Sequence, residues 1–262
     1  MKEIIKKNFE LIAFDIDGTL TVSKSPLEDN PLIDTDMSDL LNKLMVKRKV
    51  AIISGASYRQ FESQILAHLT KDSEVLKNLY LLPTNGTTLC TYTNDAWQCP
   101  PVNALTDQEK EEIYAAFDKM LAEVGFVVPR RVYGEVVEDR GSQITFSAFG
   151  QNAPIEIKQA WDKDHQKRAE MVSALKKYLP NFAAHIGGTT SIDVTRKGID
   201  KAYGLRGLLK HLNLASRDVL YIGDELYPDG NDAPALAVAG ECRAVKNPEE
   251  TKAVIVELLE QD

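Results

Sequence analysis

The sequence predicts an α/β protein: a Rossmann-like parallel sheet core with helices on both faces, plus an inserted α+β domain. Near both ends of the 262-residue chain, short apolar runs alternate with segments of helical periodicity. That order is typical of a parallel sheet with helical crossovers. In the middle of the chain, several strand patterns follow one another closely, which is typical of an antiparallel sheet.

The N-terminal part of the predicted core alternates strands and helices. The apolar runs at 10–15, 49–54 and 79–83 are continuous, as expected for strands buried on both faces of a sheet. Between them, segments 37–49 and 58–69 repeat apolar residues at helical spacing. We therefore predict a β-α-β-α-β unit at the start of the core.

The middle of the chain follows another pattern. A helix over residues 106–126 opens with a capping box formed by Thr106 and Glu109. Three segments separated by polar turns then predict an antiparallel meander: 127–133, 134–139 and 142–149. A charged helix at about 162–178 and short strands around 182–187 and 190–194 follow. We interpret the run DKDHQKRAE within that helix as a solvated face.

The C-terminal part returns to the first pattern. It predicts helices at 200–212, 233–240 and after the N-cap Asn247, with strands at 218–224 and 242–245. We therefore place the α/β core at residues 1–85 and 188–262, and the inserted domain at 86–187. Gly86 and Gly187–Gly188 suit crossings between domains at exposed loops.

Composition limits the possible partners. With a formal net charge of -8, a nucleic-acid partner held by a general basic surface is not expected. No segment reaches the roughly 20 apolar residues of a membrane span, and the N-terminus is a poor signal peptide. We expect a cytoplasmic protein whose partner is a small phosphorylated metabolite, and the sequence does not indicate the number of subunits.

Three cysteines occur, Cys90, Cys99 and Cys242, without a CxxC pair. This sparse, odd count argues against a disulfide framework or a zinc site. Pairing of Cys90 with Cys99 in an oxidising setting remains the minor alternative.

Polar side chains gather where the predicted core strands end. Asp15 and Asp17 follow the first strand, Ser54 follows the second, and Asp224 ends the strand at 218–224. Ligands of open parallel sheets bind beyond these carboxyl ends. Three carboxylates at one edge repel one another unless a cation lies among them, and oxygen donors select Mg²⁺.

The stretch FDIDGT fits an attack on a phosphoryl group. Asp15 is ionised at pH 7 and can act as a nucleophile, while Asp17, two residues on, can handle a proton. Gly18 permits a sharp turn, and the exposed amides after it can hold phosphate oxygens. Lys201 is the candidate cation. The DxD pairs of glycosyltransferases and calcium loops are alternatives, but neither requires the preceding strand together with the following Gly-Thr.

Four segments in order, FDIDGTLT, IISGAS, KGIDKAYGL and GDELYPDGND, resemble the signature motifs of the haloacid dehalogenase (HAD) phosphatase superfamily. The inserted block resembles that superfamily's type IIB cap, which sets substrate specificity. The resemblance implies that Asp15 is the nucleophile that becomes aspartyl-phosphate and Asp17 the general acid/base. It also implies that Ser54 and Lys201 bind the transferring phosphoryl group. Gly18, Thr19 and Gly55 would line the site that binds this substrate group.

The resemblance also implies a Mg²⁺ site. Asp15 and Asp224 would supply side-chain oxygens, and Asp17 its backbone carbonyl. Asn231 and Asp232 would support Asp224.

Within the superfamily, the longer fourth motif and the stretch TSIDVTRKGIDKAYGL are similar to those of eukaryotic-type phosphomannomutases. That similarity implies that Ser191 and Asp193 contact the sugar phosphate, although they could simply hydrogen-bond within a cap strand. A mutase also needs a second phosphate site in the cap. Arg131 and Arg140 could supply part of it, or could be solvated surface residues.

The two enzyme hypotheses differ in the acceptor of the phosphoryl group, which is water in a phosphatase and a sugar hydroxyl in a mutase. Where the mutase pattern has an arginine after a glycine, this sequence has Gln151, whose amide carries no charge. We therefore favour a Mg²⁺-dependent phosphatase acting on a sugar phosphate over a phosphomannomutase. A catalytically silent, metal-binding regulatory protein is the third hypothesis.

Overall fold

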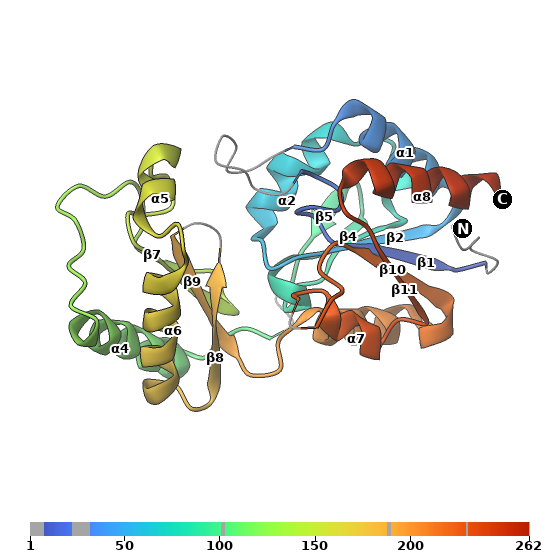
Figure 1. Ribbon diagram of the computed structural model, residues 1–262. Coiled ribbons are helices and arrows are strands. Elements are labelled where there is room, and N and C mark those ends of the chain that lie inside the picture. The colour runs from blue at the N-terminus through green and yellow to red at the C-terminus, as the bar shows by residue number, and fades with distance from the viewer. Residues whose placement is uncertain (1–7, 23–31, 101–102, 188–189, 229, 262) are drawn as a thin grey trace. The chain divides into compact units, whose positions relative to one another are not determined.

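The computed structural model describes residues 8–22, 32–100, 103–187, 190–228 and 230–261. The chain forms two compact units, a core built from both ends of the chain and a second unit that spans residues 103–198 (Figure 1). Each unit has its own hydrophobic cluster. This organisation agrees with the predicted insertion of one domain into another.

The core contains one seven-stranded sheet in the order β11-β10-β1-β2-β3-β4-β5. Its strands are β1 (Leu11–Phe14), β2 (Lys49–Ile53), β3 (Leu79–Leu82), β4 (Cys90–Thr93), β5 (Ala96–Gln98), β10 (Val219–Gly223) and β11 (Glu241–Ala244). The first three strands, β10 and β11 pair in parallel, whereas β4 and β5 extend the sheet as an antiparallel hairpin. The predicted Rossmann-like sheet is confirmed.

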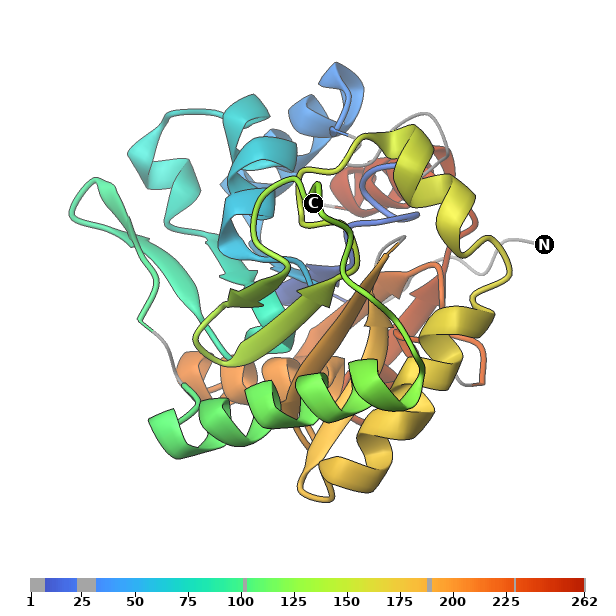
Figure 2. The same cartoon turned by 90° about the vertical axis from the view of Figure 1, so that its left-hand side faces the viewer.

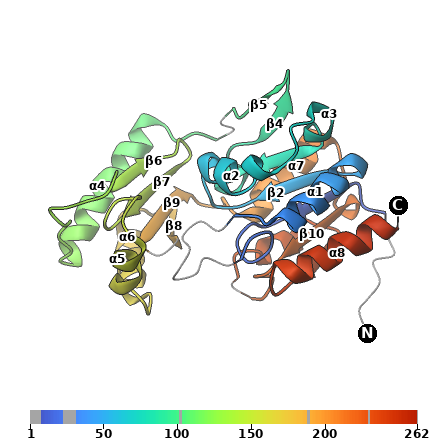
Figure 3. The same ribbon diagram turned by 90° about the horizontal axis from the view of Figure 1, so that it is seen from above.

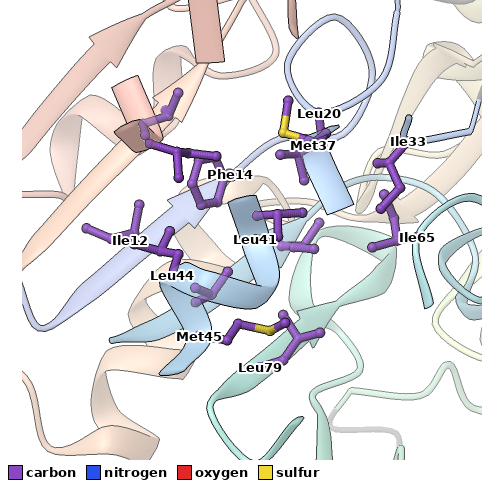
Figure 4. Close-up of a cluster of buried hydrophobic side chains, with 14 of the residues drawn as sticks. Ile12, Phe14, Leu20, Ile33, Met37, Leu41, Leu44, Met45, Ile65 and Leu79 are labelled. Atoms are coloured by element: carbon purple, nitrogen blue, oxygen red, sulfur yellow. The ribbon is translucent and has the colours of Figure 1, made fainter. Parts of the chain in front are cut away.

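Helices cover both faces of this sheet. Ile12 and Phe14 of β1 lie in one cluster with α1 (Thr35–Lys47), α2 (Tyr58–Gln64), α3 (Ser73–Leu76) and α8 (Pro248–Glu260). Figure 3 shows α1 next to α8, and Figure 4 shows the side chains of this cluster. Leu11 and Ala13 point the other way, toward α7 (Lys201–Leu212) and the 3-10 turn η4 (Ala233–Ala237). Successive residues of a strand alternate between faces, so β1 is buried on both.

Two predicted core helices differ from the structure. The helix expected at 58–69 ends at Gln64, where Ile65 leaves helical geometry with φ −121°, and continues as the 3-10 turn η1 (Leu66–His68). The helix expected at 233–240 is the 3-10 turn η4. In contrast, α8 begins at the predicted Asn247 cap, whose side chain accepts a hydrogen bond from the Glu250 amide.

The inserted unit contains a four-stranded antiparallel sheet in the order β6-β7-β9-β8. Its elements are α4 (Asp107–Glu123), β6 (Val137–Asp139), β7 (Gln143–Ser147), α5 (Ile155–Trp161), α6 (Gln166–Tyr178), β8 (Phe182–Gly187) and β9 (Ser191–Arg196). Alternate residues of β7 and β9, including Ile144 and Val194, form an apolar face that packs against α4 and α6 (Figure 2). The opposite face of these two strands is polar.

Segment 127–133 is not a strand, contrary to the prediction. Pro129 lies in its middle and has no N–H to donate to a neighbouring strand. Two backbone hydrogen bonds attach its end to the unit: Tyr133 N donates to Phe149 O, and Asn152 N donates to Tyr133 O, each at 2.8 Å.

The predicted domain boundaries at 86 and 187 are also wrong. The chain leaves the core only after β5, because β4 pairs with β3 and β5 pairs with β4. It returns near residue 199, because β9 pairs with β7 inside the inserted unit. Gly86 does not mark an exposed crossing: its φ is +82°, and a Cβ on it would lie 2.3 Å from Gly204 Cα.

Two further expectations were wrong. Cys90 and Cys99 form a disulfide that links β4 to the residue after β5. Arg168 does not lie on a solvated face: it is 1% exposed, and its Nε lies 2.7 Å from Asp162 Oδ2. Among the described residues, no helix is both long and apolar enough to span a membrane.

Candidate active site

The carboxyl ends of β1 and β10 carry the acidic part of the site. Asp15 directly follows β1, and its backbone N–H donates to the Ile222 carbonyl at 3.1 Å. Asp224 directly follows the neighbouring β10, and Lys201 is the first residue of α7. Residues far apart in the sequence therefore meet at one edge of the sheet, as predicted from the strand ends.

Lys201 is the central cation of this edge. Its Nζ lies 2.7 Å from Asp15 Oδ1 and 2.5 Å from Asp232 Oδ1, and it also donates to Asn231 Oδ1. The lysine and both aspartates are buried. Burial lowers the pKa of Lys201, but the attraction of Asp15 and Asp232 outweighs this effect, so the net pKa is raised. Lys201 is therefore a fixed positive charge beside the predicted nucleophile.

Negative charge is in excess at the site. Burial raises the pKa of Asp15 to about 7, although Lys201 opposes the shift. Burial, followed by repulsion from Asp232 and Glu225, raises the pKa of Asp224 to about 6. One lysine thus leaves part of the charge on these carboxylates uncompensated, and an additional cation would stabilise their ionised forms.

The geometry fits a divalent metal ion. Asp15, Asp224 and Asp232 each offer a carboxylate oxygen, and these oxygens all lie within 4.8 Å of one another. Hard oxygen donors and uncompensated charge are the conditions that Mg²⁺ requires. Asp232 is already engaged, because Oδ1 accepts from Lys201 and Tyr221 and Oδ2 accepts from the Glu225 amide at 2.9 Å. Asp15 and Asp224 are therefore better placed to hold an ion.

Gly18 is required by the loop geometry. Its φ is +80°, and a Cβ at this position would lie 2.2 Å from Asp224 Oδ2. Thr19 donates its hydroxyl to Asp224 Oδ1 at 3.4 Å. The Gly18 and Thr19 amides donate to the carbonyls of Thr21 and Ile16 at 2.9 and 3.2 Å. The Thr19 amide, one of those after Gly18 that are expected to hold phosphate, is thus already bonded within the loop, and phosphate binding by Gly18 and Thr19 stays a prediction. These amides close the loop, and the glycine allows Asp224 to approach it.

The remaining residues of the first two motifs lie at the same end of the sheet. Ser54 follows β2, the other neighbour of β1, and its Oγ accepts from the Ala56 amide at 3.2 Å. Gly55 follows it, and Asp17 lies in the loop after β1, where it forms an isolated bridge with Thr21. Their positions agree with the prediction, whereas their chemical roles stay predictions.

Asn231, which was expected to support Asp224 at the metal site, has side-chain hydrogen bonds to other residues. Its side-chain oxygen accepts from Lys201, and its Nδ2 donates to Glu225 Oε2 at 2.7 Å. The amide is thus oriented toward the lysine. Glu225 was not predicted as a site residue. Its position directly after Asp224 was the available signal for an additional carboxylate at the site.

A turn of unusual conformation lies beside Ser54 and was also missed. Thr84 and Asn85, in the 3-10 turn η2 (Pro83–Gly86), have φ of 48° and 55°. The Asn85 amide donates to the Ser54 carbonyl at 2.9 Å. A β-branched residue at positive φ costs on the order of 1–3 kcal/mol, and such strain clusters at functional sites. The Asn-Gly pair that follows Thr84 was the available signal for this turn.

In the inserted unit, Ser191 and Asp193 lie two residues apart on β9, on its polar face. Asp193 Oδ1 accepts from Thr145 Oγ1 at 2.7 Å, and Ser191 Oγ lies 3.0 Å from Ser147 Oγ. Both side chains therefore hydrogen-bond between β9 and β7 of the inserted unit. Contact with a sugar phosphate stays a prediction.

The other predicted cap residues have protein partners of their own. Arg140 Nε lies 2.5 Å from Glu138 Oε2, and the Arg131 guanidinium lies 5.0 Å from the centre of the Tyr133 ring. Gln151 is half-buried in the loop after β7. The contacts of the two arginines therefore do not by themselves define a phosphate site.

Comparison with known families gives a match over most of the chain. The model of the eukaryotic phosphomannomutase family matches residues 37–261. The phosphomannomutase of Saccharomyces cerevisiae is 26% identical over 254 residues, covering 95% of this chain and 93% of that protein. The phosphomannomutase of Spinacia oleracea is 27% identical over 246 residues, covering 91% of each.

Solved structures support the fold. The IMP-nucleotidase of Plasmodium falciparum has a TM-score of 0.71 at 20% identity, covering 97% of this chain and 69% of that one. A haloacid dehalogenase-like hydrolase from Bacteroides thetaiotaomicron has a TM-score of 0.65 at 16% identity, covering 97% and 100%. These likenesses confirm the predicted HAD-type architecture.

Proposed function

The chain belongs to the eukaryotic phosphomannomutase family, and from this premise we propose that it is a Mg²⁺-dependent sugar-phosphate mutase, with mannose phosphate as the first candidate substrate. This order reverses our preference for a phosphatase, because the family match spans the inserted unit and the second, third and fourth core motifs. The observation that carries the chemistry is the buried contact of Lys201 with Asp15.

In the proposed reaction, an Asp15 oxygen attacks the phosphorus of the substrate. A bond forms between that oxygen and phosphorus, and the bond between phosphorus and the sugar oxygen breaks. Asp17 donates a proton to the departing oxygen, while Lys201 neutralises charge on the phosphoryl oxygens. Asp15 must be ionised to attack, and its contact with Lys201 opposes the rise in its pKa caused by burial.

The return step reverses these roles. A sugar hydroxyl attacks the aspartyl-phosphate, Asp17 accepts its proton, and Asp15 leaves as a carboxylate. Asp15, Asp224 and the backbone carbonyl of Asp17 would hold Mg²⁺, which would polarise the phosphoryl oxygens as a Lewis acid. Ser54 would donate its hydroxyl to the same group.

The polar face of β9 is proposed to bind the sugar phosphate. Ser191 and Asp193 are held there by hydrogen bonds to Ser147 and Thr145, which fixes their side chains before any ligand arrives. Arg131 and Arg140 would supply positive charge for the second phosphate of a bisphosphorylated intermediate.

A phosphatase is the second candidate. Gln151 supports it, because the resemblance to phosphomannomutases implies an arginine at this position and the chain has a neutral residue there. Weaker retention of a bisphosphorylated intermediate would favour water over a sugar hydroxyl as the acceptor.

Product analysis distinguishes the candidates. The protein is incubated with Mg²⁺, mannose 1-phosphate and a hexose bisphosphate activator, and mannose 6-phosphate and free phosphate are measured together. We expect mannose 6-phosphate to form faster than free phosphate. Release of phosphate alone would contradict the mutase proposal and favour the phosphatase. No turnover of any phosphate ester, with or without EDTA, would favour the catalytically silent protein.

A further inference from the structure

We propose that Tyr221 is a positioning residue for phosphoryl transfer: its hydroxyl orients the carboxylate of Asp232, which in turn holds Lys201 at Asp15. This inference rests on the proposed phosphoryl transfer at Asp15. Neither the core motifs nor the strand ends point to Tyr221, because it lies inside β10, three residues before Asp224.

The tyrosine reaches the site from within the sheet. Tyr221 is fully buried on the face of β10 that packs against α7, in one cluster with Leu11 and Ala13. Its hydroxyl donates to Asp232 Oδ1, the same oxygen that lies 2.5 Å from Lys201 Nζ. Tyrosine and lysine therefore share one acceptor atom.

The other side of the Asp232 carboxylate is also fixed. Oδ2 accepts from the Glu225 amide at 2.9 Å. A Cβ on Gly223 would lie 2.4 Å from this oxygen and 2.9 Å from Tyr221 Cε1, so only glycine permits the arrangement. With donors on both oxygens, the carboxylate plane cannot rotate without losing hydrogen bonds in a buried site.

The shared oxygen sets how strongly Asp232 attracts the lysine. The ammonium group of Lys201 has three hydrogens, and it contacts Asp15, Asp232 and Asn231. Without the tyrosine hydroxyl, Asp232 Oδ1 would have more uncompensated charge and would draw Lys201 away from Asp15. In a site of low dielectric this competition is strong. Tyr221 thus balances the lysine between the two carboxylates.

The first test compares Tyr221→Phe with the wild type, using Mg²⁺ and a generic aryl phosphate. We expect kcat to fall about tenfold, the size expected for one hydrogen bond to a charged group, and KM to stay within about twofold. The affinity for orthovanadate, which imitates the transferring phosphoryl group, should fall by a similar factor. Tyr80→Phe is the matched control, because Tyr80 packs on the same face of the sheet and should leave all three values unchanged.

A double-mutant cycle with Asp232→Asn tests whether Tyr221 acts through Asp232. We expect Tyr221→Phe to change kcat less than about twofold in the Asp232→Asn background, because the link is already broken. Equal losses in both backgrounds would overturn the proposal, as would a Tyr221→Phe variant with wild-type kcat and orthovanadate affinity. Should Tyr221→Phe fail to fold, an Asp232→Asn variant with wild-type orthovanadate affinity would overturn it equally. If the wild-type protein turns over the aryl phosphate but not mannose phosphate, only the proposed substrate would be contradicted.

Discussion

Asp15 and Lys201 form a buried ion pair in which the carboxylate and ammonium groups are 2.7 Å apart. The two residues are 186 positions apart in sequence and are joined through the carboxyl end of β1 and the start of α7. Replacing Lys201 with Gln should lower kcat by about 10²–10³, because a fixed cation would be lost where charge develops. Lys210→Gln, at the exposed end of α7, is the control. Steady-state kinetics on an aryl phosphate measure both, and equal rates would contradict the role of Lys201.

Metal binding should stabilise the core. Because burial and neighbouring acids raise the pKa of Asp15 and Asp224, Mg²⁺ should relieve their repulsion and increase the unfolding temperature as its concentration rises. EDTA should reverse the increase and abolish turnover. The increase should be largely lost in Asp224→Asn and kept in Asp36→Asn, a surface control on α1. A Mg²⁺ response that Asp224→Asn retains in full would contradict this site.

The inserted unit should depend on the buried pair of Arg168 and Asp162. Replacing Arg168 with Ala leaves the Asp162 carboxylate buried beside an empty space and removes a 3.2 Å hydrogen bond to the Gly187 carbonyl. We expect a loss of about 3–5 kcal/mol in the free energy of unfolding. Lys176→Ala, on the exposed side of α6, should change it by less than about 0.5 kcal/mol. Denaturant titration measures both, and equal values would refute the structural role.

Acid should weaken the contact between α4 and β9. Hydrogen bonds from Arg196 and then from the capping Thr106 lower the pKa of Glu109 from 4.5 to about 2. A depressed pKa stabilises the fold above pH 4.5, and this contribution is lost as the pH falls toward 2. The pair is partly exposed, so we expect about 1 kcal/mol or less. In Arg196→Gln, the stability difference from wild type should shrink between pH 5 and about 2; a constant difference would contradict this account.

The disulfide can be counted chemically. Cys90 and Cys99 are paired, whereas Cys242 is free. Under denaturing conditions, thiol titration should give one thiol per chain without reductant and three after reduction. Cys242→Ser should remove the single thiol. Three thiols in the protein purified without reductant would contradict the pairing.

Much of the active site could be predicted because it lies at strand and helix ends. The apolar run before Asp15 and the glycine after Asp17 predict a buried strand followed by a sharp turn. The helical periodicity of α7 predicts a core helix, and Lys201 lies at the start of that helix. Contacts between distant side chains had no such signal. Nothing in the sequence links Tyr221 to Asp232, or shows that the Gly18 amide would bond within its own loop.

The boundaries and Arg168 were missed for related reasons. Residues 90–98 form a short hairpin that pairs with β3. Whether such a hairpin belongs to the core or to the inserted unit depends on which sheet has a free edge next to it, and this depends on tertiary structure. Arg168 stands in a run of charged residues, but its pairing with Asp162 depends on how the chain bends between α5 and α6. Local composition predicts neither the pairing of the hairpin with β3 nor the pairing of Arg168 with Asp162.

The central claim is that the phosphoryl group passes through Asp15. Rapid acid quenching during turnover of mannose 1-phosphate with Mg²⁺, followed by peptide mass spectrometry, tests it directly. We expect the mass of one phosphoryl group on the peptide containing Asp15, located at Asp15 itself and missing in Asp15→Asn. A phosphoryl group on another residue, or turnover that survives in Asp15→Asn, would contradict the account.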